Sequence, residues 1–205
     1  MKSYLQEFTV HAYKGIHNLT LESLNAINIL TGDNNSGKTS VLELLSTIGN
    51  PQDTDAWIRC ARIDGLRIRD RLYFNGFYNM FPIDDERKEI AYSLIDGDGK
   101  SDEVMLVAEL EETQVSEKEM YRLNGLSRMR SVKQEDEVVD TVCMHLYTYL
   151  NQNKAHEDVI YDFQNILPRN LNKRKPYVKT VYVSPVDHAK SSLNLNGILS
   201  DPELY

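Results

Sequence analysis

The sequence has few cysteines and no long apolar run. Only two of its 205 residues are cysteines, Cys60 and Cys143, and their separation matches no metal-ligand spacing. Two isolated thiols cannot form the disulfide framework of a small secreted domain, so we expect them to be reduced. The longest apolar run, Val104 to Ala108, is too short to span a bilayer, and the N-terminus has no apolar stretch of the signal-peptide type. The sequence therefore predicts a soluble cytoplasmic protein without a membrane partner.

Basic residues are the minority among the charged side chains. Lysine and arginine number 23 against 31 aspartates and glutamates, a formal net charge of −8. Because an acidic chain repels phosphates over most of its surface, nucleic-acid binding is restricted to a local basic patch. The candidate patch consists of Arg169, Lys173, Arg174 and Lys175. Its alternative interpretation is a solvated loop. The five histidines are dispersed, and they predict no metal cluster.

The first fifty residues predict short strands followed by a helix. Residues 5–10 and 19–21 alternate as strands do, around a turn at 13–16, and residues 27–31 form a short apolar run that predicts a buried strand. Residues 38–48 have helical periodicity and end at Gly49. The apolar face of this helix is predicted to hold Val41, Leu42, Leu44, Leu45 and Ile48, with Glu43 and Ser46 off it.

The middle of the chain contains a predicted hairpin. Residues 89–95 and 103–110 read as strands, and the Asp-Gly pairs of 96–99 between them are a strong turn signal. Residues 138–150 fit a helix by their apolar positions, but their Val, Thr and Tyr content favours a strand. The remaining predictions are helices at 55–63, 66–74 and 191–199, loops at 76–82 and 168–176, and strands at 159–163 and 177–183. The polar residues 114–137 give no clear prediction.

A glycine-rich motif lies between the apolar run and the helix. Residues 32–39, Gly-Asp-Asn-Asn-Ser-Gly-Lys-Thr, fit the pattern G-x-x-x-x-G-K-[ST] at every fixed position. The motif requires a strand before it and a helix after it, and the predicted elements at 27–31 and 38–48 supply both. This combination predicts a phosphate-binding loop for a nucleoside triphosphate and Mg²⁺.

The chemistry of the motif follows from backbone geometry. Successive N–H groups can form an anion nest, and the helix N-terminus adds its positive dipole. Gly32 and Gly37 let the backbone approach phosphate oxygens without an intervening Cβ. Lys38 offers a charge to the β- and γ-phosphates, and the Thr39 hydroxyl is placed to ligate Mg²⁺. The predicted phosphate-binding residues are Gly32, Asn34, Asn35, Ser36, Gly37, Lys38, Thr39 and Ser40.

Two features distinguish between nucleotide classes. A guanine site needs an N-K-x-D motif, and residues 153–156 and 172–175 both lack its acidic residue. ATP is therefore the expected nucleotide. A small-molecule kinase would need an arginine-rich lid, for which the chain offers a stretch that reads more simply as a solvated face, namely Arg59, Arg62, Arg67, Arg69 and Arg71.

Residues 4–48 resemble the N-terminus of prokaryotic AAA-type ATP-binding proteins with ABC-like (SMC-like) heads, which are related to the OLD-family and RecF-type ATPases. The resemblance rests on the Tyr-Lys-Gly-Ile turn at 13–16 and on the loop at 32–40 before a leucine-rich helix. Residues 181–185 resemble the strand that leads into a Q-loop, which would place residues 184–188 near the γ-phosphate, although no glutamine stands there. The resemblance also implies that Lys14 is a cation near the nucleotide. The alternative for Lys14 is a surface lysine in a turn.

The resemblance implies an α/β fold, a P-loop NTPase of the ABC-ATPase-like type. Its mixed β-sheet would combine an antiparallel N-terminal β portion with the P-loop helix. The chain is then a single N-terminal lobe, 1–205. It would comprise the strands, loop and helix of 1–50, a variable antiparallel β region at 51–176, and a Q-loop-like strand with the start of a helical region at 177–205.

Two motifs that such heads use for hydrolysis are missing. The signature L-S-x-G is absent, because residues 126–129 and 199–202 lack its glycine, and residues 92–96 lack the glutamate of an Asp-Glu strand. The catalytic residues are therefore unknown, and ATP hydrolysis is implied by the resemblance alone. The expected function is Mg-ATP binding within a DNA-maintenance or phage-defence ATPase, as a homodimer or in a larger assembly. The alternative is a non-hydrolysing nucleotide-sensing module that a partner protein completes.

Overall fold

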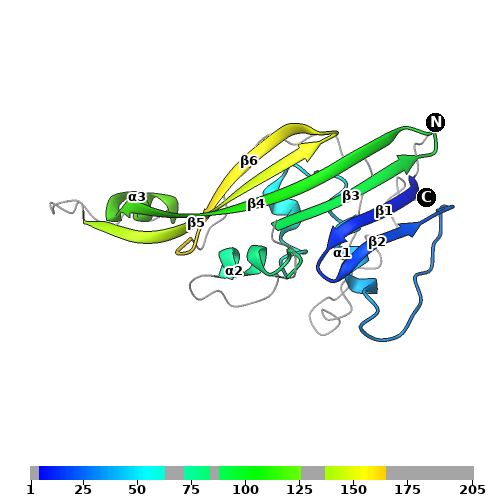
Figure 1. Cartoon of the computed structure of the whole chain (residues 1–205), viewed down its shortest axis with the longest axis horizontal. Coiled ribbons are helices and arrows are strands. Elements are labelled where there is room, and N and C mark those ends of the chain that lie inside the picture. Colours follow the sequence, from blue (N-terminus) through cyan, green and yellow to red (C-terminus); the bar gives the residue numbers. More distant parts are fainter. Residues whose placement is uncertain (1–4, 63–71, 84–87, 126–136, 165–205) are drawn as a thin grey trace, which may run out of the picture.

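A computed structural model describes residues 5–62, 72–83, 88–125 and 137–164 (Figure 1). Its elements are, in chain order, β1 (Leu5–Tyr13), β2 (Ile16–Leu21), α1 (Lys38–Leu45), the 3₁₀ helix η1 (Thr54–Trp57), α2 (Leu72–Tyr78), β3 (Lys88–Asp96), β4 (Ser101–Ser116), α3 (Glu117–Leu123), β5 (Val138–Leu150) and β6 (Asn153–Tyr161). The six strands form one sheet in the order β2-β1-β3-β4-β5-β6.

Short turns join the strands of three consecutive hairpins. The first, β1–β2, turns at Lys14-Gly15, and Lys14 has a φ of 52°. The second, β3–β4, turns where the Asp-Gly pattern predicted it, and Asp96 Oδ1 accepts the backbone N–H of Asp98 (3.0 Å) and of Lys100 (2.8 Å). The third, β5–β6, turns at Asn151-Gln152, where φ is 50° and 66°. Successive positive φ values suit a tight hairpin, so β6 begins at 153, earlier than the predicted 159.

The predicted α/β fold of the P-loop NTPase type, with a mixed sheet, is wrong. Every neighbouring pair of strands in the sheet is antiparallel. Residues 27–31, predicted as the buried strand before the glycine-rich loop, are not a strand, and Ile27 and Ile29 are 85% and 83% exposed. An apolar run becomes a buried strand only where another strand offers backbone partners, and here the strands pair mainly with their neighbours in sequence. The strand predicted at 177–183 lies outside the described residues.

The hydrophobic core lies on one face of the sheet, against α1 and the segment around Trp57. Strand residues on this face include Phe8, Tyr92, Leu106, Met144 and Ile160, each 2% exposed or less. Helix α1 contributes Val41 and Leu44, three residues apart on one side of the helix, and Ile48 joins the core from the turn after it. The predicted apolar face was too wide, because Leu42 is 46% exposed. It also missed Glu43, which is buried.

Strands β4 and β5 continue past the rest of the sheet as a two-stranded arm. The pairing of these strands runs from Val104 with Leu150 to Ser116 with Val138, which confirms the strand over the helix at 138–150. Strand β3 pairs with β4 only as far as Ala108, and β6 pairs with β5 only from Cys143 onward. Figure 1 shows the arm on the left with α3 beside it. The Ser116 hydroxyl caps α3 by accepting the Glu119 N–H.

The helices predicted in the middle region differ in extent from those observed. Only η1 forms within 54–62, and α2 ends at Tyr78, inside the predicted loop at 76–82. Three further predictions lie outside the described residues: the basic candidates at 169–175, the Q-loop-like residues 184–188 and the helix at 191–199.

Within the described ranges, no helix combines the length and the apolar content that crossing a bilayer requires.

Candidate functional site

The glycine-rich loop lies at the surface, directly before α1. Residues 32–36 are exposed, and Gly37 and Lys38 are half-buried. The backbone has positive φ at Gly32 (152°), Asn35 (65°) and Gly37 (85°). Alternation between positive and negative φ turns successive N–H groups toward one side of a loop, the arrangement that creates an anion-binding nest. One N–H group of the loop is already used, because Ser36 N–H donates to the Asp33 carbonyl oxygen (3.3 Å), and the strand predicted before the loop is absent.

Helix α1 begins at the end of this loop with its first turn open. Gly37 is the N-cap residue and supplies no side-chain hydrogen bond, and the first turn holds no acidic residue. The first backbone hydrogen bond of the helix runs from Val41 N to Gly37 O (3.0 Å). The N–H groups of Lys38, Thr39 and Ser40 come before this bond and have no acceptor within the helix. No side-chain cap accepts from them, and they lie at the positive end of the helix dipole. An anion at the loop would meet these donors first.

The Lys38 ammonium lies within the loop. Its Nζ donates to the carbonyl oxygens of Gly32 (2.7 Å) and Asp33 (2.5 Å) and to Ser36 Oγ (3.2 Å). These bonds tie the start of the loop to the helix. They also hold a positive charge inside the loop. Thr39, the predicted Mg²⁺ ligand, is exposed, as are Asn34 and Asn35, and Ser40 is half-buried.

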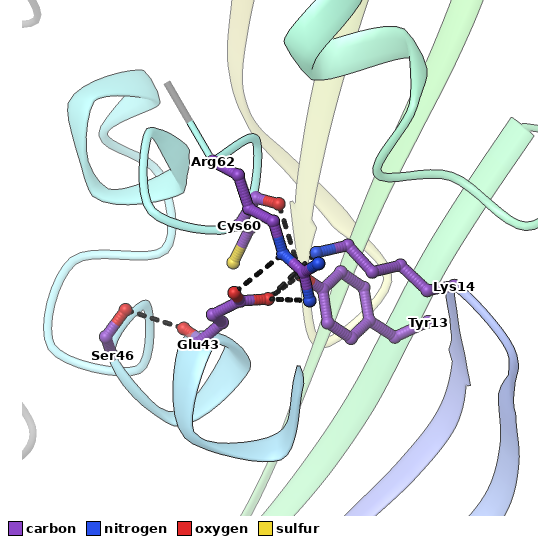
Figure 2. Close-up of polar contacts among 6 residues, drawn as sticks. All are labelled: Tyr13, Lys14, Glu43, Ser46, Cys60 and Arg62. Atoms are coloured by element: carbon purple, nitrogen blue, oxygen red, sulfur yellow. Dashed lines mark hydrogen bonds and ion pairs between the residues drawn. The ribbon is translucent and has the colours of Figure 1, made fainter. Parts of the chain in front are cut away.

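A charged cluster anchors α1 beneath the loop. Glu43 projects from α1, and its two carboxylate oxygens contact Lys14 Nζ (2.8 Å) and Arg62 Nε (2.9 Å). Figure 2 shows the side chains of Lys14 and Arg62 meeting at the Glu43 carboxylate, with Tyr13 beside them. The Tyr13 hydroxyl lies 3.1 Å from Glu43 Oε2 and 3.3 Å from the Cys60 carbonyl oxygen, so its single proton serves one acceptor at a time. The cluster connects α1 to the β1–β2 turn and to residues 60–62.

Burial governs the electrostatics of this cluster. The pKa of Lys14 is lowered because burial disfavours its charged form, and the neighbouring Glu43 carboxylate offsets only part of that effect. Burial also raises the pKa of the Tyr13 hydroxyl, and the nearby Cys60 and Glu43 raise it further. Burial raises the pKa of the Cys60 thiol to about 12, so this cysteine stays protonated. The cluster is thus a structural support, with no reactive thiolate.

The structure pairs Lys14 with α1. Its ammonium is held by Glu43 (2.8 Å), and within the described part of the chain no hydrogen bond or ion pair joins it to the loop residues 32–37. Of the arginines considered as a kinase lid, Arg62 pairs with Glu43, and residues 67–71 lie outside the described residues. Sequence reasoning missed Glu43 as the shared partner of Lys14 and Arg62. The available signal was Glu43 itself, a charged residue among the apolar residues 41–45, because a charge placed there needs a partner when it is buried.

Replacing Gly37 by alanine is expected to lower the free energy of unfolding by about 1–2 kcal/mol. The φ of 85° disfavours any L side chain, and a Cβ would lie 3.2 Å from Ile16 Cδ1. Gly99→Ala is the matched control, because Gly99 has a φ of 77° and open space where its Cβ would stand. Urea unfolding measures both. We expect a larger loss for Gly37→Ala, and a loss no larger than that of Gly99→Ala would contradict the close approach to Ile16.

Comparison of the chain with models of known protein families, with curated proteins and with solved structures finds no match.

Proposed function

We propose that this chain binds the phosphate tail of Mg-ATP through the loop and first helical turn, residues 32–40. The observation that carries the proposal is the uncapped N-terminus of α1 directly behind an exposed loop with positive φ at Asn35 and Gly37. Backbone N–H groups and a helix dipole recognise phosphate locally, so the proposal does not depend on a mixed sheet. The antiparallel sheet and the Glu43 cluster hold α1 in place.

The loop and the first helical turn have separate parts in this proposal. The N–H groups of 34, 35 and 37–40 donate to phosphate oxygens, while the Ser36 N–H stays bonded to the Asp33 carbonyl oxygen (3.3 Å). Lys38 moves from the Gly32 and Asp33 carbonyl oxygens to the β- and γ-phosphates. The Thr39 hydroxyl ligates the Mg²⁺ that bridges those phosphates. Lys14 supports α1 through Glu43 and takes no part in phosphate binding. No residue is assigned to hydrolysis, so binding is the proposed activity.

The wider setting of this activity is proposed from the resemblance of residues 4–48. We place the protein in the cytoplasm, as the nucleotide-binding part of a DNA-maintenance or phage-defence ATPase that acts as a homodimer or in a larger assembly. The free Cys60 and Cys143 accord with a reducing compartment. A non-hydrolysing nucleotide sensor completed by a partner is the alternative. Sustained Lys38-dependent ATP turnover by the chain alone would decide against that alternative.

Calorimetric titration with a series of nucleotides tests the proposal. The loop recognises the polyphosphate, so ATP and ADP should bind with Mg²⁺, and AMP should bind at least about ten-fold more weakly. Inorganic pyrophosphate should compete with ATP, and removal of Mg²⁺ should weaken ATP binding. AMP binding as tightly as ATP would show that recognition lies elsewhere. Failure of ATP to bind at millimolar concentration would overturn the proposal.

A further inference from the structure

Strand pairing brings three metal-ligating side chains together at the base of the β4–β5 arm. Cys143 and His145 stand two residues apart on β5, so they project from one face of the sheet, opposite to the core-facing Met144. Glu111 on β4 is the direct cross-strand neighbour of Cys143. A thiol, an imidazole and a carboxylate thus converge from two strands. Cys143 is buried, and the side chains of His145 and Glu111 are 23% and 63% exposed.

The distances between the ligand atoms suit one tetrahedral ion. Cys143 Sγ lies 3.5 Å from His145 Nε2, and the same nitrogen lies 3.1 Å from Glu111 Oε2. A tetrahedral zinc with ordinary Zn–S and Zn–N bonds separates its sulfur and nitrogen ligands by about 3.6 Å, and its nitrogen and oxygen ligands by about 3.4 Å. All three ligand atoms lie within 4.8 Å of one another. Since the Glu111 side chain is exposed, its carboxylate can adjust while the buried sulfur stays fixed.

A second carboxylate lies behind the imidazole. His145 Nδ1 is buried and has no hydrogen-bond partner, and Glu157 Oε1 on β6 lies 3.8 Å from it. A metal-bound histidine ordinarily donates its other ring N–H to a carboxylate, which fixes the tautomer and strengthens the ligand. A small shift of Glu157 would complete this arrangement. The buried nitrogen that lacks a partner is therefore accounted for if Nε2 faces a metal.

We propose that Glu111, Cys143 and His145 form a site for a divalent zinc-class ion. Mixed sulfur, nitrogen and oxygen donors suit Zn²⁺ and disfavour Mg²⁺ and Ca²⁺, which prefer oxygen alone. Three protein ligands leave a fourth position, which opens toward the exposed Glu111 side and takes water or another ligand. The sequence-based expectation of no metal cluster considered separation along the chain, and it missed ligands that strand pairing brings together.

The ion would also have a mechanical effect on the fold. The site lies where β6 ends beside β5 and the two-stranded arm begins, and Glu111 and Cys143 belong to different strands of that arm. A bound ion would link β4 to β5 at this point.

Titration of the full chain with Co²⁺ and Zn²⁺, without nucleotide, tests this proposal. Co²⁺ should bind one per chain and produce a thiolate-to-cobalt charge-transfer band, which Zn²⁺ should abolish by displacement. Cys143→Ser should remove the band, and His145→Gln and Glu111→Gln should each weaken Zn²⁺ binding at least about ten-fold. Circular dichroism identifies variants that fail to fold. If one of the three site variants does not fold, the metal affinities of the other two site variants test the proposal.

Three matched substitutions distinguish this site from other donors. Cys60→Ser changes the other cysteine, His17→Gln an exposed histidine on β2, and Glu112→Gln the exposed neighbour of Glu111 on the opposite face. All three should keep the wild-type affinity and charge-transfer band. The proposal is overturned if Zn²⁺ does not bind at micromolar concentration. It is equally overturned if the site variants bind as tightly as the three controls.

Discussion

Replacing Glu43 by glutamine is expected to lower the free energy of unfolding by about 3 kcal/mol. The carboxylate is almost fully buried between Lys14 and Arg62, and the Lys14 side chain is only 19% exposed. Removing one member of a buried ion pair leaves the other charge without compensation in a medium of low dielectric constant. Arg62 is 59% exposed and can turn to water, so the loss should fall at the lower end of the range for buried pairs.

Urea unfolding followed by circular dichroism measures this loss. Glu22→Gln is the control, because Glu22 is exposed and should change stability by less than about 0.5 kcal/mol. The double variant Glu43→Gln with Lys14→Met removes the stranded charge, and it should recover part of the loss. A stability for Glu43→Gln equal to that of Glu22→Gln would show that the cluster does not anchor α1.

Replacing Lys38 by alanine is expected to weaken Mg-ATP binding by about 100-fold. The ammonium supplies charge-assisted hydrogen bonds to phosphate in the proposed complex. It also ties the Gly32 and Asp33 carbonyl oxygens to α1, so its loss both removes a charge and loosens the loop. Arginine at this position keeps the charge but not the compact shape of an ammonium, and it should recover the affinity only in part.

Calorimetric titration of Lys38→Ala with Mg-ATP provides the measurement. Lys100→Ala is the matched control, since Lys100 lies in the β3–β4 turn and pairs with Asp102 at the surface. The control should bind Mg-ATP as the unmodified chain does. Equal affinity in the two alanine variants would remove Lys38 from the site.

Local patterns predicted the β1–β2 and β3–β4 hairpins, but neither the β5–β6 turn nor the order of the sheet. The Asp-Gly turn at 96–99 and the alternation of 5–10 and 19–21 specify their structures through neighbouring residues. The apolar run 27–31 does not specify its own structure, because its burial as a strand depends on a partner strand that only long-range pairing can supply. The fold class was inferred from the resemblance of residues 4–48, and the antiparallel pairing of all six strands shows that this inference was wrong. A phosphate-binding loop restricts the few residues around it and leaves the arrangement of the remaining strands undetermined.

The contacts around the candidate sites were predictable only in part. The loop residues 32–40 follow from the motif. The pairing of Lys14 with Glu43 depends on how α1 packs against the β1–β2 turn, and the convergence of Glu111 with His145 depends on the register of β4 against β5. Registers and packing angles are set by the whole core, so a sequence pattern can indicate that Glu43 is unusual without naming its partner.

Backbone amide chemical shifts on titration with Mg-ATP would show whether residues 32–40 bind the phosphates, because they report each N–H group of the loop separately. The largest shifts should fall on residues 32–40, with Gly37, Lys38 and Thr39 foremost, and AMP should leave them nearly unchanged. Saturation with Mg-ATP that leaves these amides unmoved, or that shifts only residues of the β4–β5 arm, would contradict phosphate binding by these residues.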